Sequence, residues 1–347
     1  MVKLVSLRPT IARVGSVVFG RNLLARAAEI VELAPEVERE TLPALILPGE
    51  LDRVRRSVRS STVDKEREAL TAKSRRHGAT FLYRFEDTLL GNRTVYAAGT
   101  YSVRGVRPSR FVLAGECCYV KEAQLCTHSV IDRYFGHWLR EAMPMELLAA
   151  ERGLPGLSFK RQTWLHEPGY RALMNLPGEP ISLARVDTLW IPDLRGLNDH
   201  FVRCFKELRD RVRTAGDGQG ARMVYLDRGS TGVGRQIANS DELRTALARW
   251  GFEIVMPEQL SAPEIVQRLA DARVLICVEG SAQTHATFAL PPGATLISLQ
   301  PEQHFNVVAK AYTDIVGIRF GVLVGEGDLE RFTVDVGRLR KLLDLIE

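Results

Sequence analysis

The chain has 347 residues, of which 45% are hydrophobic and 26% charged, and its formal net charge is +5. These values are ordinary for a globular protein, and they exclude a disordered chain, a collagen-like fibre and a small disulfide-rich scaffold. No apolar stretch approaches the ~20 residues that span a bilayer, and the first residues lack the features of a signal peptide, so we expect a cytoplasmic protein.

Positive charge is concentrated in residues 52–76, which hold nine Lys or Arg against four Asp or Glu and therefore carry a charge equal to that of the whole chain. Such a segment can lie against anionic lipid or nucleic acid. It contains no aromatic residues that could stack on bases, which disfavours nucleic acid. We predict a peripheral contact with the inner face of a membrane. The alternative is a solvated helix with salt bridges.

The N-terminal half is predicted to mix helices and antiparallel strands. Apolar residues at helical spacing predict a helix over residues 22–34, whereas residues 78–120 are rich in β-branched and aromatic residues and predict antiparallel strands with a turn at Gly91-Asn92. A helix is expected from His137 to Gly153, interrupted at Pro144. Further on we expect a strand, a helix, a strand and an amphipathic helix over residues 161–166, 168–176, 186–192 and 199–214.

From about residue 200 onward, apolar strands alternate with short helices. The expected strands are residues 221–228, 252–257, 273–280 and 293–300, with helices over 239–251, 261–272 and 281–290. This alternation predicts a parallel sheet covered on both faces. We therefore predict an α/β protein with an N-terminal domain over residues 1–195 and a Rossmann-type domain over residues 196–347. The last helix, residues 336–347, could pack on the first domain.

Ligands of parallel α/β sheets bind beyond the carboxyl ends of the strands. The predicted strand ends place Asp227-Arg228 and residues 257–259, 279–281 and 300–303 on one rim. Gly280-Ser281 would open a helix there, and a helix start favours an anion such as a nucleotide diphosphate. No strand is followed by the GxGxxG pattern of dinucleotide sites, and the P-loop pattern is absent from the sequence.

Charged side chains near this rim suggest phosphate and hydroxyl recognition. Arg228 and Arg235 flank a glycine-rich loop, and two guanidinium groups can clamp phosphate oxygens. Glu279 is a candidate hydroxyl reader or acid/base group, or only a favourable charge at a helix start. His285 lies one helical turn later and is either a ligand contact or a core histidine. His137, at the start of a helix, is either a base near pH 7 or a capping residue.

Cysteine usage argues against a metal site. Cys117, Cys118, Cys126 and His128 are close in sequence, but adjacent strand residues point to opposite faces and the spacing matches no zinc motif. We expect reduced, buried thiols.

Taken together, these motifs resemble glycosyltransferase family 61, which includes bacterial capsular-polysaccharide-type transferases. The Gly-His-aromatic element stands at residues 134–139, and the strand-end arginine is Arg228, followed by Arg235 and Asn239. A Pro-Glu-x-Leu-Ser element containing Glu258 follows at residues 257–261, and an apolar strand, a Gly-Ser turn, a helix and a Pro-Gly complete the pattern at residues 274–301. The order holds across about residues 128–301.

The resemblance implies a two-domain GT-B-like fold that transfers a sugar from a nucleotide-activated donor to an oligosaccharide or lipid-linked acceptor, in surface-polysaccharide assembly and without metal or cofactor. In that reading His137 is the expected base, with Glu279 as second choice. The expected donor-binding residues are Arg228, Arg235, Asn239, Glu258, Gly280, Ser281 and His285. Many family members have His and Asn where Glu279 and His285 stand. A catalytically silent glycan- or nucleotide-binding protein, and a transferase of another group such as pyruvyl, therefore remain alternatives.

Overall fold

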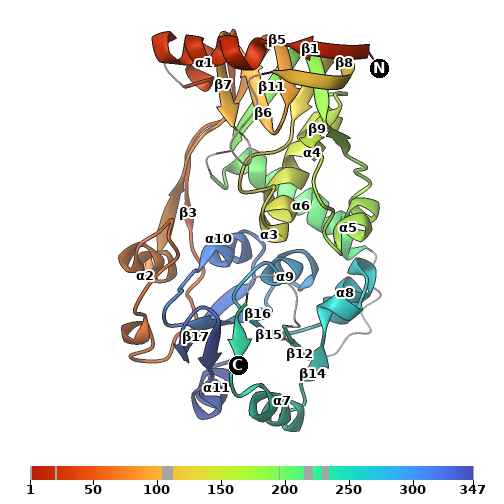
Figure 1. The fold of residues 1–347 in the computed structure, drawn as a ribbon. Helices are drawn as coiled ribbons and strands as arrows, with labels where there is room; N and C mark the ends of the chain where they lie inside the picture. The colour runs from red at the N-terminus through yellow and green to blue at the C-terminus, as the bar shows by residue number, and fades with distance from the viewer. Residues whose placement is uncertain are drawn as a thin grey trace. The chain divides into compact units, whose positions relative to one another are not determined.

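The computed structural model describes residues 2–19, 22–103, 112–194, 196–214, 222–228 and 234–346. The chain divides into two compact units, each with a mixed α/β architecture (Figure 1). Unit 1 comprises Met1–Val37 and His77–Leu208, and unit 2 comprises Glu38–Arg76 and Arg209–Glu347. Among the described residues, no helix combines the length and the apolar character needed to cross a membrane.

Unit 1 is built on a nine-stranded sheet in the order β10-β9-β8-β11-β5-β6-β7, with β1 also paired to β8 and β2 to β5. The strands are β1 (Val2–Ser6), β2 (Glu29–Ala34), β5 (Thr80–Gly91), β6 (Thr94–Ala97), β7 (Thr100–Val103), β8 (Leu113–Leu125), β9 (Gly156–Phe159), β10 (Glu179–Ile181) and β11 (Leu183–Leu194). The expected antiparallel strands are confirmed in β5, β6 and β7. Their first turn uses Asn92 and Arg93 at positive φ, 48° and 53°, as a tight hairpin requires.

The helices of unit 1 include a long interrupted one. They are α1 (Arg8–Phe19), α3 (Phe135–His137), the π-helical turn η3 (Trp138–Ala142), α4 (Met143–Glu151), α5 (Glu167–Met174) and α6 (Asp199–Arg213), the last of which contains the boundary to unit 2. The helix expected from His137 to Gly153 is confirmed together with its interruption. The π turn lies immediately before Pro144, which cannot donate a backbone hydrogen bond.

Two elements expected in unit 1 differ in the structure. Residues 22–34 form a short 3-10 turn, η1 (Leu24–Arg26), and the strand β2 instead of a helix. Pairing with β5 outweighs the helical spacing, and the Glu29 carboxylate lies 2.7 Å from Nε of Arg84 across the pair. Residues 161–166 form no strand. Instead, the Arg161 guanidinium lies over the Trp164 ring, with its Cζ atom 3.5 Å from the ring centroid, and the other neighbours of Trp164 include the Phe135 ring.

Unit 2 contains a seven-stranded sheet in the order β13-β18-β17-β16-β15-β12-β14. Its strands are β12 (Met223–Leu226), β13 (Gln236–Ile237), β14 (Glu253–Val255), β15 (Val274–Val278), β16 (Thr295–Pro301), β17 (Arg319–Gly327) and β18 (Arg331–Thr333). The expected parallel sheet is confirmed in five strands, β14, β12, β15, β16 and β17. In chain order these five strands are arranged 2-1-3-4-5, whereas a dinucleotide-binding Rossmann sheet has the order 3-2-1-4-5-6.

Helices cover both faces of this sheet. They are α7 (Ser240–Arg249), η4 (Pro257–Gln259), α8 (Ala262–Leu269), α9 (Gln283–Ala289), α10 (Val308–Ile315) and α11 (Val336–Leu343). The last helix packs into the core of unit 2, where Leu339 and Leu342 of α11 are fully buried in one cluster with Leu243 and Leu247 of α7. The amphipathic pattern of α11 serves the core of its own unit.

Residues 38–76 belong to unit 2, which differs from the expected division at residue 195. After β2 the chain runs through β3 (Val37–Glu40), η2 (Leu51–Arg53) and α2 (Val63–Thr71), and it returns through β4 (Ser74–His77), which pairs with β3. Leu45 enters the core of unit 2, and the fully buried Glu50 forms an ion pair with Arg338. Leu45 and Glu50 are far in sequence from the rest of unit 2. The sequence pattern alone therefore could not assign them to that unit.

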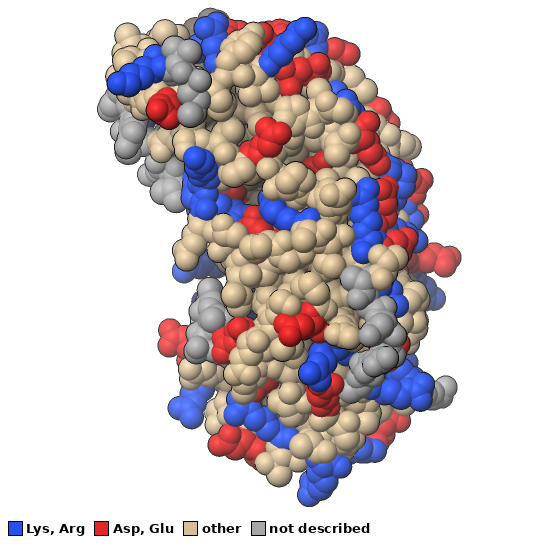
Figure 2. Space-filling view, turned by 90° about the vertical axis from the view of Figure 1, so that its right-hand side faces the viewer, with Lys and Arg blue, Asp and Glu red and all other residues tan. Residues whose placement is uncertain are grey.

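The basic segment 52–76 is only partly helical. Its central part lies along the chain that follows β16, where the backbone amides of Arg55 and Arg56 both donate to the Glu302 carbonyl. Glu66 of α2 is 8% exposed and accepts a hydrogen bond from the Val307 amide at 2.7 Å. Figure 2 draws the side that lies at the right of Figure 1, away from α2, and the basic and acidic side chains of the described residues are interspersed there too. The segment is therefore integrated into unit 2 instead of forming a separate charged helix.

Candidate functional site

The carboxyl ends of β12 and β15 adjoin at the centre of the unit 2 sheet. The two strands are parallel neighbours, with Leu226 opposite Cys277. The chain connects β12 first to β14 on one side and then to β15 on the other, so a topological switch point lies between them. Ligands of open α/β sheets bind at such switch points. Arg228 follows the end of β12 and Glu279 follows the end of β15, which confirms that these predicted residues share one rim.

Arg228 and Arg235 converge on the turn after β15. The Nη1 atom of each guanidinium donates to the backbone carbonyl of Glu279, at 3.3 Å from Arg228 and 3.1 Å from Arg235. Gly280 has φ +139°, and a Cβ there would lie 2.8 Å from Arg235 Nη1 and 2.9 Å from Arg228 Nη1. Only glycine therefore lets both arginines pack over this turn.

Glu279 is 3% exposed and organises the arginine pair. Its carboxylate lies 2.9 Å from Arg235 Nη1, and its Oε1 atom accepts a hydrogen bond from Nδ2 of the Asn306 side chain at 2.8 Å. A carboxylate this buried is stabilised by its charged and hydrogen-bonding partners. This geometry makes Glu279 a positioning residue for Arg235 and disfavours it as a base.

His304 completes the surroundings of Arg235. Its Nε2 atom lies 3.1 Å from Arg235 Nη2, and burial together with the Arg235 charge lowers the pKa of His304 to about 4. The ring is therefore neutral at pH 7 and accepts the hydrogen bond from the guanidinium. Burial, with a contribution from Arg235, also lowers the pKa of Arg228. Arg228, Arg235 and Glu279 together carry a charge of +1.

The helix start differs from the one expected at Gly280-Ser281. Helix α9 begins at Gln283, and the amides of Gln283 and Thr284 donate to the carbonyls of Gly280 and Ser281. The turn residues Gly280 and Ser281 are partly exposed, whereas His285 is 2% exposed inside α9. The arginine pair, more than the short helix, provides the positive charge, and burial favours the reading of His285 as a core histidine.

Asn239 and Glu258 occupy different positions from the arginine pair. Asn239 exchanges hydrogen bonds with the backbone of Val334, at 2.8 and 3.0 Å, and donates to Glu242, so its amide joins α7 to the chain after β18. Glu258 lies in η4 after β14, and its Oε2 atom is buried without a hydrogen-bond partner among the described residues. The glycine-rich loop between Arg228 and Arg235 contains residues 229–233, which lie outside the described residues.

A second polar cluster lies in unit 1 around the predicted base. His137 Nδ1 lies 2.5 Å from Glu141 Oε1, and the other carboxylate oxygen of Glu141 lies 2.9 Å from His128 Nε2. The side chain of Glu141 is 19% exposed, and those of His137 and His128 are 27% and 34% exposed. One half-buried carboxylate therefore holds two partly accessible imidazoles, which we call the His-Glu-His cluster (His128, Glu141, His137).

The interrupted helix positions this cluster. His137 ends α3 and Glu141 lies four residues later in the π turn, so their side chains lie on the same side. Hydrogen bonds from both histidines outweigh desolvation and lower the pKa of Glu141 to about 2, so the carboxylate is ionised at neutral pH. When His137 Nδ1 carries the proton shared with Glu141, its Nε2 can accept a proton from a hydroxyl group.

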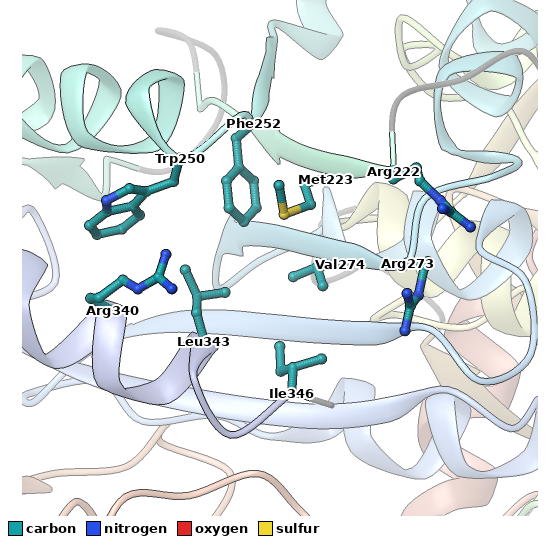
Figure 3. A pocket seen from close by; sticks show the side chains of 9 residues that line it. All are labelled: Arg222, Met223, Trp250, Phe252, Arg273, Val274, Arg340, Leu343 and Ile346. Atoms are coloured by element: carbon teal, nitrogen blue, oxygen red, sulfur yellow. The ribbon is translucent and has the colours of Figure 1, made fainter.

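A separate cavity of about 420 Å³ lies at the amino ends of the unit 2 strands, whereas the arginine pair lies at their carboxyl ends (Figure 3). Met223 and Val274 begin β12 and β15, so the cavity is at the amino ends of the strands. The side chains that line it are mostly apolar, with three arginines: Arg222, Met223, Trp250, Phe252, Arg273, Val274, Arg340, Leu343 and Ile346. None of the predicted site residues lines it. Because sheet ligands bind at carboxyl ends, we do not assign the donor site here.

Within the described residues, no group of three His, Cys, Asp or Glu side chains is arranged to hold a metal ion. Four of the five free cysteines are buried. Burial raises the pKa of Cys204 and of Cys277 to about 12, which makes these thiols unreactive at neutral pH.

Four site residues were not predicted from the sequence: Glu141, His128, His304 and Asn306. The last two follow the predicted rim segment at residues 300–303 by only a few positions, so extending that segment would have included them. Glu141 stands four residues after His137, a spacing that indicates contact on a helix. Nothing in the sequence indicated that His128, nine residues before His137, shares this carboxylate.

Comparison with known proteins gives one match to a family model. Residues 135–297, just under half of the chain, match the family model described as Glycosyltransferase 61. The expected resemblance is thereby confirmed over a segment that contains His137, Arg228, Arg235 and Glu279, and it supports a glycosyltransferase. No curated protein matches the chain.

Among solved structures, the chain is similar to the rubredoxin oxygen:oxidoreductase from the anaerobe Desulfovibrio gigas, with a TM-score of 0.27 and 10% identity. The similarity covers 65% of this chain and 58% of that one. At this TM-score and identity the likeness carries no argument about fold or function.

Proposed function

We propose that this chain, whose residues 135–297 belong to glycosyltransferase family 61, transfers a sugar from a nucleotide-activated donor to a hydroxyl group of an acceptor. One observation carries the donor part of the proposal. Two arginines pack over a glycine turn at the switch point of a parallel sheet, where this class of fold binds its ligands.

The arginine pair suits the leaving group of such a reaction. When the glycosidic bond to the donor breaks, negative charge develops on the nucleoside diphosphate, and preorganised cations stabilise it in the transition state. Arg228 and Arg235 are held by the same Glu279 carbonyl, so they need no rearrangement to meet the diphosphate. We propose a metal-independent mechanism in which these two guanidinium groups supply the charge that a bound cation would otherwise supply.

In this proposal the His-Glu-His cluster provides the base. His137 Nε2 takes the proton of the acceptor hydroxyl, the hydroxyl oxygen forms the new bond to the anomeric carbon, and the bond to the diphosphate breaks. Glu141 orients the ring through Nδ1 and stabilises the imidazolium that forms. His128, bonded to the other oxygen, fixes the carboxylate in position.

For Glu258, the buried oxygen after β14 suggests contact with a donor hydroxyl at the same edge of the sheet. We also propose that the acceptor is an oligosaccharide or a lipid-linked glycan of surface-polysaccharide assembly, at the inner face of the membrane. The basic segment 52–76 supports this, since it carries excess positive charge.

Calorimetric titration with a panel of nucleoside diphosphates tests the donor site. We expect one diphosphate to bind, and Arg228→Ala or Arg235→Ala to weaken it tenfold or more, because each charge-assisted hydrogen bond contributes roughly 1.5–3 kcal/mol. Gly280→Ala should have a similar effect through the displacement of both guanidinium groups.

Arg222→Ala is the matched control, because it removes an arginine from the cavity at the opposite edge of the same sheet. Its affinity should equal that of the unmodified protein. If Arg222→Ala weakens binding and the Arg228 and Arg235 variants do not, the donor site is the cavity of Figure 3 and the proposal fails.

A further inference from the structure

Helix α1 exposes several large apolar side chains. Ile11, Val14 and Val18 are 62%, 63% and 68% exposed, and Leu7, just before the helix, is 61% exposed. These four positions follow a 4-3-4 spacing, which on a helix forms one continuous stripe. Val5 of β1 and Val17, 75% and 82% exposed, lie at its margins. We call these six residues the α1 stripe.

The opposite side of the helix carries small residues and contacts unit 1. Ala12 and Ser16 are 4% and 5% exposed, and a Cβ at Gly15 would lie 2.1 Å from the Gly99 carbonyl oxygen after β6. The helix therefore lies close against the β6–β7 hairpin through a face that admits no larger side chain (Figure 1). An ordinary surface helix buries its apolar stripe, whereas α1 is inverted.

The charge around the stripe indicates what covers it. Residues 1–28 contain Lys3, Arg8, Arg13, Arg21 and Arg26 and no Asp or Glu. Of these, Arg8 is paired with Asp87 of β5. A stripe of branched apolar side chains in a segment with this excess of basic residues is typical of helices that lie in the interface of an anionic membrane. A second copy of the chain would bring two basic segments together, and like charges oppose that contact.

We propose that the α1 stripe docks into the headgroup–acyl boundary of an anionic lipid surface. The helix would lie in the plane of that surface, with Ile11, Val14 and Val18 inserted. The inference is independent of the donor site, since every contact that supports it lies in unit 1. It also differs from the proposed contact of segment 52–76, which is purely electrostatic.

Co-sedimentation of the full chain with vesicles tests this proposal. We expect binding to phosphatidylcholine vesicles containing phosphatidylglycerol, and at least a tenfold weaker binding to phosphatidylcholine alone. The triple variant Ile11→Ser, Val14→Ser and Val18→Ser should lose the binding tenfold or more, with an unchanged melting temperature because all three positions are exposed. Ile30→Ser, which removes another apolar side chain that is 56% exposed, should bind like the unmodified protein.

Two controls distinguish the stripe from its rivals. Arg55→Gln with Arg56→Gln and Arg59→Gln neutralises part of segment 52–76 and should retain most of the binding. Equal binding of the triple serine variant and the unmodified protein would overturn the proposal. So would light scattering that finds a dimer which the triple variant converts to a monomer, together with no vesicle binding, because the stripe would then bind a second copy.

Discussion

At the scale of residues, Glu141 connects two histidines, His128 and His137. Its two oxygens bond separate imidazoles, and its pKa of about 2 keeps it ionised wherever the enzyme would operate. A carboxylate in this position selects the tautomer of His137 and fixes the orientation of its ring. We therefore expect the activity of His137 to depend on Glu141 even though Glu141 itself transfers no proton.

Replacement of these residues separates binding from turnover. His137→Ala should keep the affinity for nucleoside diphosphate and lose 10²–10⁴-fold in transfer rate, the usual effect of removing a general base. Glu141→Gln keeps the shape of the side chain, and we expect a smaller loss in rate together with a shifted pH–rate profile. Initial rates from pH 5 to 9 measure both effects.

Glu279→Gln is the matched control for the base. Because the Glu279 carboxylate is buried against Arg235, its removal should weaken diphosphate binding and leave the pH–rate profile in place. A variant of His137 that retains full activity, beside a Glu279→Gln variant that binds diphosphate normally but does not turn over, would make Glu279 the base.

At the scale of elements, the C-terminal unit was the more predictable. Its apolar strands and short helices alternate along the chain, and in the structure Ser261 forms a side-chain cap of α8 in a capping box. Strand ends then placed Arg228 and Glu279 on one rim, because parallel strands end at the same edge. The elements wrongly predicted in unit 1 owe their structure to partners distant in sequence, such as β5 for residues 29–34.

Helix α9 ends in an unusual cap that can be tested. Arg209 is 4% exposed and donates to the carbonyls of Thr287 and Phe288 at 3.2 Å each, and to that of Leu290. A buried guanidinium here satisfies carbonyl groups that the helix end leaves without partners. Arg209→Met should lower the free energy of unfolding by about 2–4 kcal/mol, measured by urea denaturation, because it leaves these acceptors buried.

Arg209→Lys is the comparison for this cap. It keeps a positive charge at the helix end but has no planar fork for several carbonyls, so we expect an intermediate loss of stability. Equal stability of the Met variant and the unmodified protein would mean that water satisfies the carbonyls and that the cap is dispensable.

At the scale of the whole molecule, the division into two units shows what patterning cannot reach. The sequence predicted two domains, but it could not predict that residues 38–76 leave unit 1 and return. Residues 38–76 are attached to unit 2 by individual long-range contacts, such as the ion pair of the buried Glu50 with Arg338. Such contacts produce no periodic pattern in the sequence. The same holds for His128, which contacts Glu141 within unit 1, and for Asn306, which contacts Glu279 within unit 2, since neither contact belongs to a motif.

The response of the protein to acid belongs to this scale as well. His304 has an ordinary pKa of 6.5 that burial and Arg235 lower to about 4 in the folded chain. Between these two values the unfolded chain binds more protons than the folded chain, so lowering the pH favours unfolding. The stability that neutral His304 contributes is fully present above about pH 6.5 and is lost as the pH falls toward about 4.

Thermal unfolding at pH 7 and pH 5 measures this linkage. One proton changes the free energy of unfolding by at most ~1.4 kcal/mol per pH unit, and partial exposure of the ring reduces that value. His304→Gln retains an acceptor for Arg235 and removes the titration, so its melting temperature should fall less between the two pH values. Glu141 does not change the stability between pH 7 and pH 5. Folding lowers its pKa from 4.5 to about 2, so the stability that the ionised carboxylate contributes is lost only below about pH 4.5. If the glutamine variant and the unmodified protein lose the same melting temperature from pH 7 to 5, His304 is protonated in the folded chain and does not accept from Arg235.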